Sequence, residues 1–170
     1  MDLKESTQNV TAGAAVEVIK NLAENVHTCL MMTELNKKPI SVRPMAIQKV
    51  DDSGSIYFFS SKESHKNLQL KENNEMQITI QNEGSSEYMS LYGKAISYRD
   101  QKEIDEMYSK YVDTWFKGKE DPDISIIRFD TTEGYYWDTK HGKLVQMAGF
   151  LYGAVTGART DDSLEGKIKL

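Results

Sequence analysis

Hydrophobic and polar positions follow two different periods along this chain. Apolar residues between 14 and 22 recur at helical spacing, and Thr11 precedes them as a candidate helix cap. The segments with strand-like patterns come next, at 27–35, 40–50, 56–60, 76–81 and 88–98. Turn-forming residues lie at 36–39 and 51–54, and Gly93 is a predicted bend point within the longest strand. The first half therefore predicts one helix followed by strands, with a short helix at 64–72.

The second half begins with a predicted helix and returns to strands. Asp100 and Glu103 form a capping-box pattern, which predicts a helix from 100 to about 115. Its apolar face would contain Ile104, Met107, Tyr108, Tyr111 and Trp115. Strands are predicted at 124–129 and 134–139, separated by a loop at 130–133. Residues 147–155 fit a short helix and an apolar strand equally well.

Tight turns join most of the predicted strands, which argues against an alternating parallel α/β sheet. We therefore predict a mainly β chain with helices (α+β), built around an antiparallel barrel. A length of 170 residues suits a single domain with a sizeable core. We expect that domain to span 1–156 and the polar residues 157–170 to form a mobile tail.

Composition narrows the possible partners and the cellular location. The formal net charge of −5 argues against nonspecific binding to nucleic acid. No apolar run is long enough to cross a bilayer, so no membrane partner is expected. The single cysteine, Cys29, excludes an internal disulfide and lies in an apolar setting typical of a buried residue. With a polar N-terminal segment that shows no secretory signal, these features predict a cytoplasmic protein.

Several kinds of chemistry are poorly supported by the sequence. The three histidines are far apart and only one cysteine is present, so no metal site is predicted. The chain contains no GxGxxG, Walker, GxSxG or HExxH motif. The acidic run at 120–123 is interpreted as a solvated loop. No residue can be assigned a catalytic role, so the catalytic residues are unknown at this point.

A candidate phosphate site lies between residues 56 and 70. An apolar strand ends in the hydroxyls of Ser60 and Ser61, and Ser64, His65 and Lys66 open the following helix. Hydroxyls, a cation and the N–H groups of a helix N-terminus together suit a phosphate monoester. A polar turn with a helix cap explains the same residues without any ligand.

Two further residues are candidates for a ligand site. Arg43 lies within a predicted strand and is able to bind a phosphate bidentately, although a cross-strand ion pair is the alternative. Trp137 has the ring to pack near a planar cofactor, and core or interface packing is its alternative role. The order of Arg43, the candidate phosphate site and Trp137 along the chain strengthens the prediction that both residues belong to a ligand site.

These segments, taken in order, resemble the FMN-binding split-barrel families related to pyridoxamine 5'-phosphate oxidase, and in particular the bacterial general stress protein branch. The resemblance covers about 16–139. It is carried by Arg43-Pro44-Met45, Tyr57-Phe58-Phe59-Ser60, Ser64-His65-Lys66, Tyr92-Gly93-Lys94-Ala95, Trp115-Phe116-Lys117-Gly118 and Tyr136-Trp137-Asp138. It implies a split antiparallel β-barrel of the Greek-key, FMN-binding split-barrel type. It also implies a homodimer with the cofactor in grooves at the interface.

The resemblance assigns roles to individual residues. Arg43 matches the strand arginine near the flavin phosphate, and Lys66 matches the lysine of the phosphate motif. Ser60 stands where the oxidase has a threonine, and Trp137 matches the tryptophan near the cofactor. The backbone of 43–48, which includes Pro44 and Met45, is expected to contact the flavin ring edge. With Ser61, His65 and Tyr88, these residues make up the predicted cofactor site.

The chain also departs from the oxidase pattern at several positions. His65 replaces an arginine of the phosphate motif, so phosphate affinity is expected to depend on pH. Tyr88 stands where the oxidase has a glutamine near the flavin. Lys143 and Val145 replace the Arg-x-His motif that holds the pyridoxal phosphate substrate. True pyridoxamine phosphate oxidase activity is therefore not expected.

Together these features predict a flavin-binding oxidoreductase with a stress-related role. FMN is the expected cofactor ahead of FAD or a deazaflavin, and a nicotinamide nucleotide is the expected electron donor. The alternative is a non-catalytic flavin-binding protein, or a dimeric interaction protein whose cofactor site is degenerate. The sequence leaves the electron acceptor and the stress open.

Overall fold

The structure is a computed structural model that describes residues 9–139 and 163–170. Its helices are α1 (Ala12–Val26), α2 (His65–Glu72) and α3 (Gln101–Met107), followed by the 3-10 helix η1 (Lys110–Thr114). Its strands are β1 (Val10–Thr11), β2 (Thr28–Thr33), β3 (Ser41–Ala46), β4 (Lys49–Val50), β5 (Ile56–Ser61), β6 (Glu75–Asn82), β7 (Glu87–Tyr98), β8 (Ile124–Thr139) and β9 (Ser163–Lys169). The predicted α+β class is confirmed.

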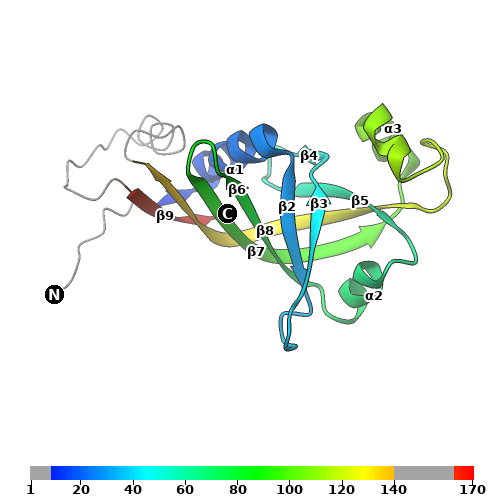
Figure 1. The fold of residues 1–170 in the computed structure, drawn as a ribbon, viewed down its shortest axis with the longest axis horizontal. Helices are drawn as coiled ribbons and strands as arrows, with labels where there is room; N and C mark the ends of the chain where they lie inside the picture. The colour runs from blue at the N-terminus through cyan, green and yellow to red at the C-terminus, as the bar shows by residue number, and fades with distance from the viewer. Residues whose placement is uncertain (1–8, 140–162) are drawn as a thin grey trace.

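One mixed sheet contains all of these strands (Figure 1). Seven of them follow the order β1-β9-β8-β7-β6-β2-β3, while β5 branches from β8 and β4 pairs with β5. The long strand β8 pairs with β7 along one edge. Along its other edge, its first half pairs with β5 and its second half with β9. Only the β1–β9 pair is parallel among the described strands. The sheet therefore divides along one edge of β8, with β5 on its first half and β9 on its second half, as in a split barrel.

The register of the sheet separates a buried face from an exposed one. Met31 of β2 pairs with Arg43 of β3 and with Ile78 of β6, and Ile78 pairs with Leu91 of β7. Because paired residues project to the same face, Met31, Ile78 and Leu91 enter one core, where each is fully buried. Helix α1 covers this core through Val18, Ile19 and Leu22, as its apolar spacing predicted.

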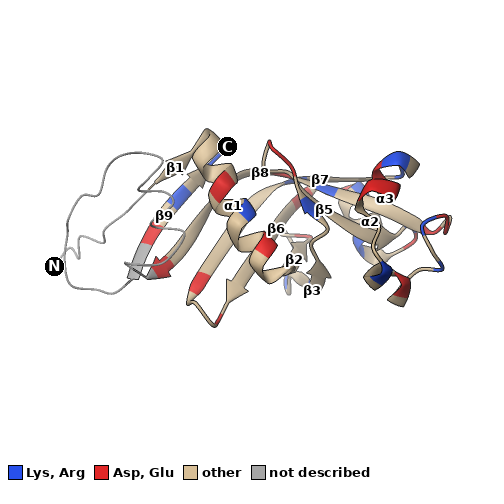
Figure 2. Ribbon diagram, turned by 90° about the horizontal axis from the view of Figure 1, so that it is seen from above, with Lys and Arg blue, Asp and Glu red and all other residues tan. Residues whose placement is uncertain are grey.

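Charged residues occupy the outer side of α1. Glu17, Lys20 and Glu24 alternate in sign along it (Figure 2). Lys20 also reaches Asp52 in the turn before β5, with 2.5 Å between Nζ and Oδ1. The helix is therefore amphipathic, as its pattern predicted. Among the described residues, no helix has the length and apolar character of a membrane span.

The predicted helix over 100–115 is wrong in its second half. Asp100 caps α3 by accepting a hydrogen bond from the backbone N–H of Glu103, as predicted. The helix ends at Met107 because Tyr108 is extended, with its ring near Phe59 and its hydroxyl donating to Asp113. A separate 3-10 turn follows, and it leaves Trp115 exposed instead of on a buried helical face.

The two strands predicted at 124–129 and 134–139 form one continuous strand, β8. The residues between them stay paired with β7, where the register shifts between Tyr92 and Gly93. Thr132 is the extra residue of this bulge, since Glu133 pairs with Tyr92 and Thr131 pairs with Gly93. The predicted loop at 130–133 is therefore a bulge of β8, and Gly93, the predicted bend point of β7, lies opposite it.

The predicted mobile tail is wrong for its final residues. Residues 163–169 form β9, which pairs with β8 and with β1. Ile168 lies between the exposed Lys167 and Lys169 and is buried in the core beside Val10. This one buried apolar residue anchors the strand. The prediction for 147–155 and the remainder of the tail lie outside the described residues.

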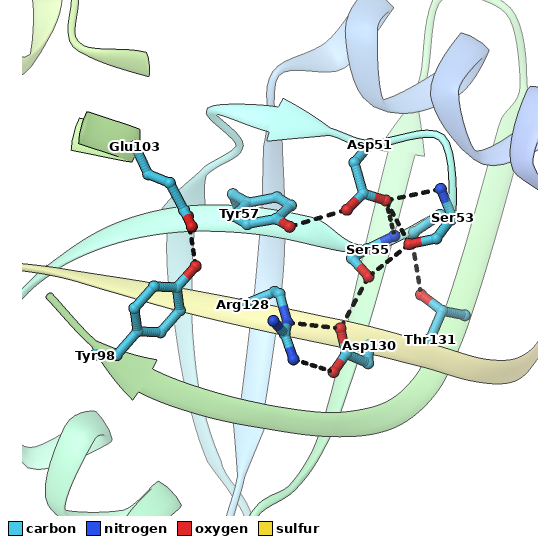
Figure 3. Close-up of polar contacts among 10 residues, drawn as sticks. Asp51, Ser53, Ser55, Tyr57, Tyr98, Glu103, Arg128, Asp130 and Thr131 are labelled. Atoms are coloured by element: carbon cyan, nitrogen blue, oxygen red, sulfur yellow. Dashed lines mark hydrogen bonds and ion pairs between the residues drawn. The ribbon is translucent and has the colours of Figure 1, made fainter. Parts of the chain in front are cut away.

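A polar cluster holds the turn between β4 and β5 (Figure 3). Asp51 Oδ1 accepts hydrogen bonds from the backbone N–H groups of Ser53 and Ser55, at 2.9 and 3.0 Å, and its Oδ2 accepts from the Tyr57 hydroxyl at 2.9 Å. Ser55 Oγ also donates to Asp130 on β8 at 2.8 Å. Burial raises the pKa of Asp51, but the hydrogen bonds outweigh it and hold the pKa below its ordinary value.

We expect Asp51→Ala to lower the free energy of unfolding by about 2 kcal/mol at pH 7, because it leaves the turn donors without their acceptor. A native pKa below the unfolded value of about 3.9 stabilises the fold above that pH and is lost as pH falls through the native pKa. Urea denaturation from pH 7 to pH 3 should therefore show the gap between parent and variant shrinking below about pH 4. Asp52→Ala, next to it and exposed, should have little effect at any pH; an equal effect would contradict the assignment.

Candidate functional site

The candidate phosphate site forms where β5 ends and α2 begins. Ser60 is buried, and its Oγ lies 3.0 Å from Ser64 Oγ. The backbone N–H of Ser64 donates to the Ser61 carbonyl at 3.0 Å, which turns the chain into the helix. Ser64 then caps α2 by accepting from the Asn67 N–H at 3.4 Å. The helix and cap that the sequence predicted are confirmed.

Arg43 reaches this region from β3. Its Nη1 donates to Thr33 Oγ1 at 2.7 Å, and its Nη2 donates to Gln69 Oε1 at 3.1 Å. Thr33 is fully buried at the end of β2, and Gln69 lies on α2. Both partners are neutral. The guanidinium is therefore held in place on neutral oxygens, and the charge of the nearby Glu34 acts on it through space without a direct ion pair.

Gln69 also separates Arg43 from the nearby acid. Its Nε2 donates to Glu34 Oε2 at 2.7 Å, so the amide lies between this carboxylate and the guanidinium. Lys37 pairs with the other oxygen of Glu34. Glu34 thus has its own cation, and the cross-strand ion pair considered for Arg43 is not among the contacts of the described residues.

Lys66 is half-buried on the first turn of α2. Burial lowers the pKa of Lys66, and the positive charge of Arg43 lowers it further. Neither cation takes part in an ion pair within the described part of the chain. The two neighbouring cations repel one another, and an anion placed between them would relieve that repulsion. The donors present fit a phosphate group.

The other predicted residues of this region lie around the two cations. Met45 shares the face of β3 with Arg43 and packs against the main core, whereas Pro44 is exposed on the opposite face. Ser61 is half-buried at the strand end. His65 is exposed at the first position of α2. The structure therefore gathers Arg43, Ser60, Ser61, His65 and Lys66 around the start of one helix, with Pro44 directed away.

Tyr88 and Trp137 lie on a different face. They pair across β7 and β8, and 39% and 37% of their surfaces are exposed. Tyr88 is three residues from Leu91, so it projects away from the face that carries Leu91, Met31 and Arg43. Trp137 Nε1 donates to Glu165 Oε2 at 3.0 Å. Within one chain the structure does not bring these two aromatic residues to the Arg43–Lys66 pair.

Tyr88 and Trp137 belong to an exposed apolar face of the sheet, which we call the outer face. It also contains Leu30, Val42 and Tyr135, which are 46%, 51% and 45% exposed. Tyr135 stacks near Trp137, with 6.2 Å between the ring centroids. Apolar faces of this kind are typical of protein interfaces.

Sequence reasoning missed Thr33 and Gln69, the two residues that hold Arg43. Gln69 stands three positions after Lys66, a helical spacing that places both on neighbouring parts of one surface. That spacing would have identified Gln69. Nothing local to Thr33 marks it, since its role depends on the pairing of β2 with β3. No cluster of metal-ligating side chains occurs in the residues that the structure describes.

Comparisons with known proteins agree with the architecture. A family model described as pyridoxamine 5'-phosphate oxidase like matches residues 14–161. Protein bli-3 of Neurospora crassa is 24% identical over an alignment of 139 residues. The match covers 75% of this chain and 66% of that protein. The chain therefore spans slightly less than two thirds of that relative's length.

Two solved structures share the fold. General stress protein 26 of Bacillus anthracis has a TM-score of 0.64 at 19% identity, over 71% of this chain and 92% of its own. The general stress FMN/FAD binding protein of Xanthomonas citri also has a TM-score of 0.64, at 21% identity, over 87% of this chain and 96% of its own. Identities this low support the split-barrel fold alone.

Proposed function

The chain belongs to the pyridoxamine 5'-phosphate oxidase-like family, and on that premise we propose that it binds FMN and acts as an oxidoreductase with a stress-related role. The observation that carries the proposal is the pair formed by Arg43 and Lys66, two neighbouring cations of which Arg43 is held by neutral oxygens. Such a pair suits the phosphate of a flavin mononucleotide. The name of the Xanthomonas citri protein, which binds FMN or FAD, supports a flavin as the ligand.

The bound flavin would supply the hydride or electron transfer, and this chain would hold and orient it. Arg43 and Lys66 would bind the phosphate, with hydroxyls of Ser60 and Ser64 close to them. Gln69 and Thr33 position the guanidinium of Arg43 without neutralising it. No acid–base residue lies among these groups, which suits a reductase that draws on a nicotinamide nucleotide.

We also propose that the protein is a homodimer that pairs through the outer face. The support is the position of Trp137, which lies on the opposite face of the sheet from Arg43 in the same chain. A second copy docked on the outer face would cover the exposed rings of Tyr88 and Trp137. The exposed apolar side chains of Leu30, Val42 and Tyr135 would then be covered.

Three finer points complete the proposal. FMN is preferred to FAD or a deazaflavin because the cation pair suits a terminal phosphate monoester. The replacement of the substrate motif by Lys143 and Val145 argues against oxidation of pyridoxamine phosphate. A cytoplasmic location fits the single, buried Cys29, which needs no oxidising compartment.

The test compares FMN with riboflavin, which lacks the phosphate. We expect the protein to bind FMN at least tenfold more tightly than riboflavin, as measured by flavin fluorescence titration at pH 7. Bound flavin should then be bleached by NADH or NADPH without oxygen and should recover with an added acceptor. Protein that takes up neither flavin would refute flavin binding, and a flavin that stays oxidised would favour the non-catalytic alternative.

A further inference from the structure

A pocket of about 190 Å³ lies beside α2, away from the Arg43–Lys66 pair. Asn67 and Lys71, four positions apart on α2, line it together with Lys62. The end of β7 contributes Arg99 and the start of β8 contributes Ser125. Neither Arg43 nor Lys66 lines this pocket, although Asn67 in its lining donates a backbone hydrogen bond to Ser64.

Three cations surround this pocket. Lys62 and Lys71 are in none of the ion pairs that the described residues form. Arg99 donates to neutral oxygens: the carbonyls of Asp121 and Ile124, at 2.9 and 2.6 Å, and the side-chain oxygen of Gln101, at 2.6 Å. These bonds fix the guanidinium, whose charge also helps to lower the pKa of Asp121 without a direct ion pair. Three cations from three segments favour an anionic ligand.

The carboxylates near the pocket accept hydrogen bonds from groups other than the three cations. The carboxylate of Asp121 accepts hydrogen bonds from the backbone N–H groups of Lys117 and Asp123, both at 2.9 Å. Glu103 accepts from the Tyr98 hydroxyl at 2.5 Å. Asp123 meets Lys62 through backbone atoms, as the Lys62 N–H donates to its carbonyl. No carboxylate bond to the three cations is found in the described part of the chain.

Asn67, one of the residues that line the pocket, has a buried acceptor without a donor. Asn67 is 1% exposed, and its Nδ2 donates to Ser125 Oγ at 2.7 Å. Ser125 Oγ donates its own hydrogen to the Ser60 carbonyl at 2.8 Å. It can therefore only accept from Asn67, which identifies the bonded amide atom as Nδ2. Asn67 Oδ1 is left without a hydrogen-bond partner among the described residues. Buried acceptors normally have a partner, so a donor is missing here.

We propose that this pocket binds inorganic phosphate as the hydrogen phosphate ion. Its P–OH group donates to Asn67 Oδ1, and its remaining oxygens accept from Lys62, Lys71 and Arg99. The volume is well below the roughly 300 Å³ at which pockets for larger ligands begin, which suits a single oxyanion. Sulfate has the same shape but carries no proton at neutral pH, so the pocket discriminates against it.

Isothermal titration of the full chain with phosphate and with sulfate, at pH 8 and equal ionic strength, tests the proposal. Phosphate should bind at least tenfold more tightly than sulfate. Phenyl phosphate, a monoester that loses its last P–OH above about pH 6, should bind at least tenfold more weakly than inorganic phosphate. Without flavin, the Arg43–Lys66 pair would itself bind phosphate and phenyl phosphate, so each titration is repeated with Lys66→Ala and the expected ratios apply to that variant.

Three variants locate the binding. Lys71→Ala should weaken phosphate binding at least fivefold, whereas Lys66→Ala and the exposed control Lys102→Ala should leave it within twofold. Loss of phosphate binding in Lys66→Ala but not in Lys71→Ala would assign the ion to the flavin site and overturn the proposal. Equal binding of phosphate and sulfate would overturn it as well, as would equal binding of phenyl phosphate.

Discussion

Replacing Lys66 with alanine should weaken FMN binding more than tenfold and leave riboflavin binding within twofold. The variant removes one of the two cations proposed to hold the phosphate, and a charge-assisted contact of this kind is worth about 1.4 kcal/mol or more. Riboflavin has no phosphate to lose. Flavin fluorescence titrations with both ligands at pH 7 measure the two dissociation constants, and their ratio isolates the phosphate contribution.

The comparison also separates binding from folding. If Lys66 merely supported α2, the variant would weaken both flavins together, and the phosphate assignment would fail. The control is Lys102→Ala on α3, an exposed lysine outside the site. It changes the net charge equally, so a long-range electrostatic effect would appear in both variants.

Replacing Gly93 with alanine should lower the free energy of unfolding by about 3 kcal/mol or more. A Cβ at this position would lie 2.1 Å from the Asp130 carbonyl oxygen and 2.9 Å from its carbon. Both atoms belong to the backbone of β8, which is held by its pairs with β7. The bulge would have to open to admit the methyl group. Urea denaturation of the purified variant measures the loss.

Gly13→Ala provides the matched control for the same change. A Cβ at Gly13 would have no neighbour within 4 Å, and the residue lies in α1. Alanine there should stabilise the fold by about 0.5–1 kcal/mol, because glycine costs more backbone entropy in a helix. If the two variants had similar stabilities, the close approach at Gly93 would not be what constrains the bulge.

Local patterns were sufficient for much of the fold. The apolar spacing of α1 depends on residues within that one helix, and the caps at Ser64 and Asp100 depend on residues within one helical turn. The helix after Asp100 was predicted too long because its apolar spacing continues past Tyr108. There the contact of Tyr108 with Phe59, a residue distant in sequence, replaces helical packing.

Long-range pairing accounts for what the sequence did not reveal. The continuity of β8 depends on a bulge that β7 stabilises, and β9 depends on pairing with β8 and with β1 near the other end of the chain. The predicted site shows the same distinction between local and long-range contacts. Lys66 and the serines are neighbours in sequence, whereas the neutral supports of Arg43 come from a strand and a helix that meet only in the folded chain.

The length of β8 has a consequence for stoichiometry. This strand runs along the long axis of the molecule (Figure 1), and its path from Ser125, beside the start of α2, to Trp137 covers about 40 Å. Under the proposed function, the start of α2 would hold the phosphate and Trp137, far along β8, would serve a second site. In a twofold pair each of these regions would meet its complement from the other chain. Two copies would then complete two identical sites, so flavin should fill such a pair at one molecule per chain.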